Sequence, residues 1–178
     1  MRTDYLVVPA LVLLLSAFSV EAQARTRWVK FSPPDKSFSI VLPRKPIYQH
    51  SDLNYDEQGV FDGNMRADDY DFSPNDSGTT SLITVFHLAR PKSRQQFDKE
   101  CDSIMEVIAG DDKQFDKRAS LTINGLHARE YLFRKGSIRG RVLIVNARTR
   151  IYFLQYHTET GVLPSFVAGI FRSFRVAR

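Results

Sequence analysis

Residues 121–157 constrain the fold of this chain more than any other stretch, because they read as four β-strands joined by three tight turns. Asn124-Gly125 lies between apolar residues and suits a type I′ hairpin turn, in which both central residues need positive φ. Gly136-Ser137 predicts the second turn, and Arg148-Thr149, which contains no glycine, predicts the third. The stretch is therefore predicted to form an antiparallel meander.

Apolar residues occupy both odd and even positions along these predicted strands. Val142 and Ile144 point to one face of the sheet, and Leu143 and Val145 point to the other, because successive strand side chains alternate. A sheet with one face in water alternates apolar and polar residues, whereas a sheet covered on both faces need not. We therefore expect covering layers on both sides of this sheet.

The first residues have the features of an export signal. Arg2 precedes an apolar run over residues 6–20, and Ala22-Gln23-Ala24 fits a small-x-small cleavage site. The run is shorter than the about 20 residues that a membrane-spanning helix needs. We predict a signal peptide over residues 1–24, cleavage after Ala24, and a periplasmic or secreted mature protein without a transmembrane span. An uncleaved membrane anchor is the alternative.

Length and composition bound the rest of the chain. A chain of 178 residues gives one domain after removal of the leader, predicted over residues 25–178. Cys101 is the only cysteine, so no internal disulfide can form and the core itself must hold the fold. A formal net charge of +5 favours acidic partners only modestly.

Two helices are predicted outside the meander. Ser93 and Gln96 fit a capping box, and Gly110 stands where a helix C-cap belongs. The apolar stripe of this first helix is Phe97, Cys101, Ile104, Met105 and Ile108. Pro164 suits the first position of the second helix. Its apolar stripe is Leu163, Phe166, Val167, Ile170, Phe171 and Phe174. Strands are predicted over residues 38–42, 47–53, 65–72 and 81–89.

The two ends of the predicted domain resemble a known family. The opening WVKFSPPDKSFSIVLPRKP and the close GRVLIVNARTRIYFLQYHTETGVLPSFVAGIFRSFRVA are similar to the PsbP/Mog1-like group. The resemblance implies an α/β (α+β) fold in which helices flank an antiparallel sheet, a three-layer α/β/α sandwich. Members are mostly non-enzymatic: the plant photosystem proteins are extrinsic subunits that assist metal and chloride retention, and the Mog1 proteins bind a small GTPase. The opening strand ends in Pro43-Arg44-Lys45-Pro46 without the tryptophan of the photosystem branch, so no metal or partner residue carries over.

A cluster of basic residues in the meander is the first candidate site. Its members are Arg129, Arg134, Lys135, Arg139, Arg141, Arg148 and Arg150. Arginine presents a planar fork that matches carboxylates and phosphates. The cluster suggests docking of an acidic protein, an anionic polymer or a lipid head group at a sheet edge. The alternative is a solvated face whose arginines pair with Glu130 or with acids of the first helix. Nucleic acid is not expected, because the chain has no nucleic-acid-binding motif.

Other residue types indicate no metal, cofactor or catalytic residue. No pair among His50, His87, His127 and His157 has the i, i+4 spacing of a helical metal site. The acidic run Asp68, Asp69, Asp71 and Asp76 lacks the glycine and closing glutamate of a calcium loop, so we read it as a polar loop. Cys101 on the apolar stripe is expected to be a core residue. The chain contains no G-x-S-x-G or S-x-x-K motif.

The sequence therefore favours an exported, non-catalytic binding or assembly module of the cell envelope, with an arginine-rich sheet edge that docks an anionic partner. One alternative is a small exported hydrolase, for which His127 or His157 should lie beside an acid or serine in a deep pocket. The other is a purely structural subunit, for which Trp28 or Tyr48 should belong to an exposed aromatic patch.

Overall fold

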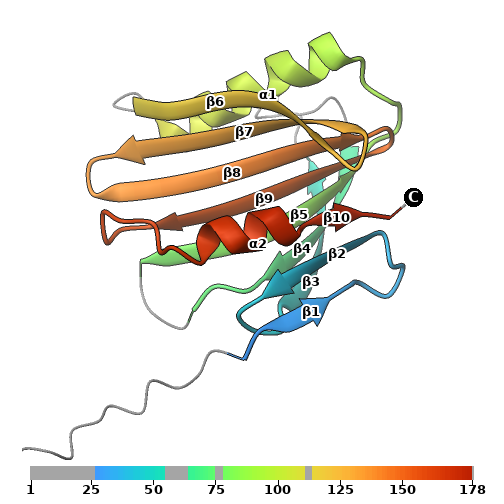
Figure 1. Ribbon diagram of the computed structural model, residues 1–178. Coiled ribbons are helices and arrows are strands. Elements are labelled where there is room, and N and C mark those ends of the chain that lie inside the picture. Colours follow the sequence, from blue (N-terminus) through green and yellow to red (C-terminus); the bar gives the residue numbers. More distant parts are fainter. Residues whose placement is uncertain (1–26, 55–63, 75–77, 111–113, 178) are drawn as a thin grey trace, which may run out of the picture.

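A computed structural model describes residues 27–54, 64–74, 78–110 and 114–177. The predicted leader, residues 1–24, lies outside this part of the chain. A seven-stranded antiparallel sheet dominates, with the order β3-β4-β5-β9-β8-β7-β6 (Figure 1). Its strands are β3 (Ile47–Asn54), β4 (Asn64–Asp71), β5 (Thr79–His87), β6 (Gln114–Ile123), β7 (Leu126–Lys135), β8 (Ile138–Ala147) and β9 (Arg150–Thr158).

The predicted meander is confirmed as strands β6 to β9. Each of its three connections is two residues long, at the predicted positions. Asn124 and Gly125 have φ of 51° and 82°, as a type I′ turn requires. The glycine-free third turn forms because Arg148 itself adopts the left-handed region, with φ of 63°.

Each face of the large sheet carries a cluster of buried apolar residues, as the apolar residues at both odd and even positions of the strands indicated. Val142 and Ile144 belong to a core cluster beneath helix α1 (Arg94–Ala109), while Leu143 and Val145 belong to a second cluster on the opposite face. The second cluster packs under helix α2 (Val167–Ser173) and strand β2 (Phe38–Leu42). Figure 1 shows α1 behind the sheet and α2 in front of it.

Helix α1 begins and ends where its capping signals predicted. The Ser93 side chain accepts a hydrogen bond from the Gln96 backbone, and the Gln96 side chain accepts one from the Ser93 backbone, completing the capping box. At the other end, Gly110 has φ of 68°, and its N–H donates to Glu106 O at 3.1 Å. This helix packs against one face of the meander.

Helix α2 begins later than predicted. Pro164 precedes it in a turn in which Val167 N–H donates to Pro164 O at 3.0 Å, so the proline is not the first helical residue. Phe174 leaves the helix in an extended conformation, with ψ of 131°. It leads directly into strand β10 (Arg175–Val176).

A second, smaller sheet joins the two ends of the described chain. It contains β1 (Val29–Phe31), β2 and β10, in the order β1-β2-β10 (Figure 1). The fold is therefore mixed α+β and dominated by antiparallel sheets. No helix in the described part of the chain has both the length and the apolar character needed to cross a bilayer.

Candidate functional site

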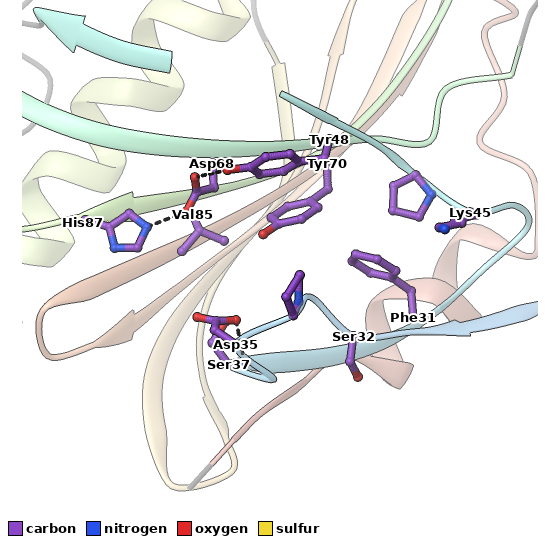
Figure 2. A pocket seen from close by; sticks show the side chains of 12 residues that line it. Phe31, Ser32, Asp35, Ser37, Lys45, Tyr48, Asp68, Tyr70, Val85 and His87 are labelled. Carbon is purple, nitrogen blue, oxygen red and sulfur yellow. Dashed lines mark hydrogen bonds and ion pairs between the residues drawn. The ribbon is translucent and has the colours of Figure 1, made fainter. Parts of the chain in front are cut away.

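A cavity with a volume of about 590 Å³ lies between the β1–β2 segment and strands β3, β4 and β5 (Figure 2). Its walls combine aromatic rings and prolines with a few charged side chains. The lining residues are Phe31, Ser32, Pro34, Asp35, Ser37, Lys45, Pro46, Tyr48, Asp68, Tyr70, Val85 and His87. Figure 2 shows Asp68, His87 and Asp35 toward one end of the cavity and Lys45 toward the other.

Three neighbouring strands converge on the carboxylate of Asp68. Strand pairing places His50 of β3 directly opposite Asp68 of β4, and its Nδ1 lies 2.9 Å from Oδ1. His87 of β5 reaches the other oxygen, with Nε2 2.7 Å from Oδ2. The Tyr48 hydroxyl donates a third hydrogen bond to Oδ1 at 2.9 Å. A carboxylate has about four acceptor positions, so one remains for a ligand.

The Asp68 carboxyl is held in its charged form. Partial burial opposes ionisation, but the hydrogen bonds from His50, His87 and Tyr48 outweigh it and lower the pKa of Asp68 below its ordinary value. The same contact raises the pKa of Tyr48, because ionisation would remove the proton that it donates to Asp68. The site therefore presents a fixed negative charge beside a protonated phenol.

This pKa shift predicts how Asp68 contributes to stability as the pH changes. A carboxyl whose folded pKa lies below its unfolded value of about 3.9 stabilises the fold above that pH, and the stabilisation is lost as the pH falls through the folded pKa. Asp68→Asn is therefore expected to lower the unfolding free energy by about 1.5–3 kcal/mol at pH 7, the range for hydrogen bonds to charged groups. The difference in unfolding free energy between this variant and the wild type should disappear in acid.

Urea unfolding of both proteins between pH 7 and pH 2.5 measures this gap. Asp116→Asn, which alters a carboxylate 45% exposed and paired with Arg134, is the matched control and should show a much smaller gap. A gap that stays constant across the acid range would contradict the role given to the charge of Asp68.

A second carboxylate reaches the same end of the cavity. Asp35 accepts a hydrogen bond from Ser37 N–H at 3.1 Å and forms an ion pair with Arg150, Nη1 to Oδ2, at 3.0 Å. Burial opposes ionisation, but these contacts lower the pKa of Asp35. Arg150 compensates the charge of Asp35, and the ionised carboxylate of Asp68 is a second negative charge at this end of the cavity.

Aromatic rings form the wall beside these carboxylates. The Tyr70 ring centroid lies 5.4 Å from that of Tyr48 and 5.5 Å from that of Phe31. Burial and the nearby charges of Asp68 and Asp35 raise the pKa of Tyr70, so its hydroxyl stays protonated. Aromatic faces attract cations. The cavity is thus suited to a ligand with a cationic group and an apolar body.

The structure divides the arginine cluster among separate surfaces. Arg134 and Arg139 lie opposite each other on β7 and β8, and Arg141 follows on the same face, where it binds the buried Glu130 with Nη2 to Oε1 at 2.5 Å. Arg129 lies on the other face and pairs with Asp102 of α1 at 2.9 Å. Arg150 pairs with Asp35, which lines the cavity, and Arg148 lies in the β8–β9 turn.

The other basic residues of this region divide in the same way. Lys117 of β6 joins Arg141 at Glu130, so two cations share one buried carboxylate. The Lys135 side chain lies against Gly110 at the C-terminus of α1. Arg134, Arg139, Arg141 and Lys117 therefore form one basic face, which we call the β6–β8 face.

The two histidines named for a hydrolase are far apart in the sheet. His127 stands at the start of β7, where its Nε2 lies 2.6 Å from Asp98 Oδ1, and His157 stands near the end of β9, where burial lowers its pKa. Neither lines the cavity. Among the described residues, no three His, Cys, Asp or Glu side chains are arranged to hold a metal ion.

The reading of the acidic run as a polar loop is wrong for Asp68, Asp69 and Asp71, whereas the strand predicted over residues 65–72 is confirmed as β4. Asp68, Asp69 and Asp71 lie in strand β4, where alternation sends neighbours to opposite faces, so Asp69 accepts a hydrogen bond from Thr84 while Asp68 faces the cavity. Asp76 lies outside the described residues. Cys101 is fully buried in the core under α1, as predicted, and burial raises the pKa of its thiol.

Sequence reasoning missed the grouping of His50, Asp68 and His87. The strands that carry these three residues were predicted. The register between the strands was not, because the lengths of the connecting segments do not determine which residues lie opposite each other. The signal lay in the alternation within residues 65–72, which separates Asp68 from Asp69.

Comparison with solved structures identifies proteins of similar fold. No family model and no curated protein matches the chain. The solution structure of cyanobacterial PsbP (CyanoP) from Synechocystis sp. PCC 6803 is similar over 91% of this chain and 99% of its own, with a TM-score of 0.56 and 10% sequence identity. The chain has a PsbP-like fold. This confirms the resemblance to the PsbP group, and at 10% identity it establishes the fold alone.

Proposed function

We propose that this chain is an exported, non-catalytic binding module of the cell envelope that captures an amine or guanidinium group of its ligand in the cavity at Asp68. The ionised carboxylate of Asp68, held by His50, His87 and Tyr48 beside aromatic rings, carries this proposal. Lys45 at the other end repels a cation there, so the ligand's positive group is directed to Asp68.

The finer features of this assignment are proposals too. Residues 25–178 form a single domain whose layers correspond to an α/β/α sandwich, a proposal supported by the PsbP-like fold and by cores on both faces of the large sheet. Export is supported by the apolar run over residues 6–20 and by Ala22-Gln23-Ala24. Protein recovered from the envelope is expected to begin at Arg25.

Binding of a matched pair of probes tests the cavity. 2-Phenylethylamine and 2-phenylethanol share one aromatic body, but only the amine is cationic. The wild type is expected to bind the amine at least about tenfold more tightly, which corresponds to about 1.4 kcal/mol. The measurement is a titration followed by NMR shifts of the Tyr70 and Val85 backbone amides.

Asp68→Asn should reduce the preference for the amine to within about twofold, whereas Asp116→Asn should leave it unchanged. Equal affinity of the wild type for the two probes would contradict the proposed function. So would an undiminished preference in Asp68→Asn.

The β6–β8 face supports a second candidate function, the docking of an acidic partner protein. Arg134 and Arg139 lie directly across from each other, so two guanidinium groups share a small surface next to Arg141 and Lys117. Asp116 and Glu130 compensate two of these four charges and leave an excess of positive charge.

Charge reversal tests the docking of an acidic partner. Arg134→Glu with Arg139→Glu is expected to abolish salt-sensitive retention of the protein on envelope fractions and on immobilised poly-glutamate. The matched control is Arg90→Glu together with Arg172→Glu, two exposed arginines outside strands β6 to β8. If the paired reversal on the β6–β8 face and the control reduce retention equally, the effect is one of net charge and the docking face is wrong.

A further inference from the structure

A second cavity, with a volume of about 380 Å³, lies along the seam where the small sheet meets the large sheet. It is at the end of this seam opposite the cavity at Asp68. The first cavity takes Phe31 from the end of β1 and His87 from the end of β5, whereas the second takes Trp28 before β1 and Ser81 near the start of β5. Its lining is Trp28, Pro43, Arg44, Phe72, Pro74, Ser81, Tyr156 and Phe166.

The walls of this second cavity are aromatic and reach the protein surface. Trp28 and Phe166 are 44% and 39% exposed, and their rings meet edge to face with centroids 5.9 Å apart. Phe166 continues the wall to Tyr156, at 6.1 Å. A planar ring can pack against these side chains, and the volume of the cavity falls in the range of small-molecule sites, roughly 300–1,000 Å³.

A buried hydroxyl without a partner lies in the lining. Ser81 is fully buried, and its Oγ has no hydrogen-bond partner among the described residues. Its own backbone groups are already used, because Ser81 N–H donates to Ser73 Oγ at 2.8 Å and Ser81 O accepts from Phe72 N–H at 2.9 Å. Buried hydroxyls are nearly always paired, so this one marks a place for a ligand's polar atom.

The charged residue of the lining indicates the charge of the ligand. Among the described residues that line this cavity, Arg44 is the only one with a formal charge. A guanidinium matches a carboxylate in geometry as well as in charge. The aromatic wall, the guanidinium of Arg44 and the hydroxyl of Ser81 each select one part of a ligand. A ligand that suits all three has a flat apolar body, a carboxylate at one end and a hydrogen-bonding atom at the other.

We propose that this cavity binds a small aromatic carboxylate, with its ring against Trp28 and Phe166, its carboxylate at Arg44 and a distal hydroxyl at Ser81. The site is separate from the cavity at Asp68 and takes a ligand of opposite charge. Either site can therefore fail experimentally without affecting the other.

Three probes separate the contacts of this proposal. 4-Hydroxybenzoate offers both polar ends, benzoate lacks the distal hydroxyl, and 4-hydroxybenzyl alcohol lacks the carboxylate. Trp28 is the only tryptophan, so its single indole N–H resonance reports binding directly. In the wild type, 4-hydroxybenzoate should bind about tenfold more tightly than either of the other two.

Two variants assign these contacts to residues. Ser81→Ala should weaken 4-hydroxybenzoate about tenfold and leave benzoate unchanged, while Arg44→Gln should weaken both carboxylates and leave the alcohol unchanged. Asp68→Asn should affect none of the three. The proposal is overturned if 10 mM 4-hydroxybenzoate does not move the indole resonance. It is also overturned if 4-hydroxybenzoate binds no better than benzoate, which is the result expected if Ser81 Oγ holds only water.

Discussion

Phe38→Ala is expected to lower the unfolding free energy by about 3–5 kcal/mol, the range for removing a buried phenylalanine. Phe38 on β2 is 2% exposed, and its ring meets those of Tyr70, Tyr152 and Phe174 with centroids 5.5, 5.7 and 5.7 Å away. These rings come from the large sheet and from the segment that follows α2. The side chain of Phe38 therefore connects the small sheet to the rest of the fold.

Urea unfolding checks this prediction against a substitution of the same type. Phe166→Ala removes a ring that is 39% exposed, so it should cost less than about 1.5 kcal/mol. Similar costs for the two variants would show that Phe38 does not join the sheets. A total stability of about 5–15 kcal/mol is usual, so the loss at Phe38 should also be visible as a large fall in melting temperature.

Gly140→Ala is expected to destabilise the fold by about 1–3 kcal/mol through overpacking. Gly140 is buried on β8 directly opposite Phe133 of β7. A Cβ atom added at Gly140 would lie 2.1 Å from Cε1 of the Phe133 ring, which is itself packed in the core under α1. The ring occupies the space that any side chain at this position would need.

A double-mutant cycle isolates this contact. Phe133→Leu should relieve the crowding, so the double variant should be more stable than the sum of the single effects predicts. Gly169→Ala in α2, where an added Cβ meets nothing within 4 Å, is the matched control and should be neutral or stabilising. Additive effects of Gly140→Ala and Phe133→Leu would contradict the steric explanation.

Local signals were enough to predict much of this fold. The meander followed from two-residue turns and from apolar residues on both parities, because turn geometry and alternation act within a few residues of the chain. The capping box of Ser93 and Gln96 located α1 for the same reason. The start of α2 was misplaced because Pro164 also suits the turn that precedes the helix.

Pairing between distant segments decided the candidate sites. Arg129 and Arg141 both appeared in one basic cluster, but the strand pleat sends them to opposite faces and to different carboxylates, Asp102 and Glu130. Ser81 gave no signal in the sequence, because only the packing of β5 against Tyr156 and Phe166 leaves its hydroxyl buried without a partner.

The sequence by itself determined the antiparallel meander, the two covered faces of its sheet, the first helix and the resemblance to PsbP. Only the tertiary structure decided that His50 and His87 meet at Asp68, and that the two sheets leave a cavity at each end of their seam. The reason is physical: turns, caps and alternation are short-range properties of the chain, whereas a binding site depends on the register between strands that are far apart in sequence.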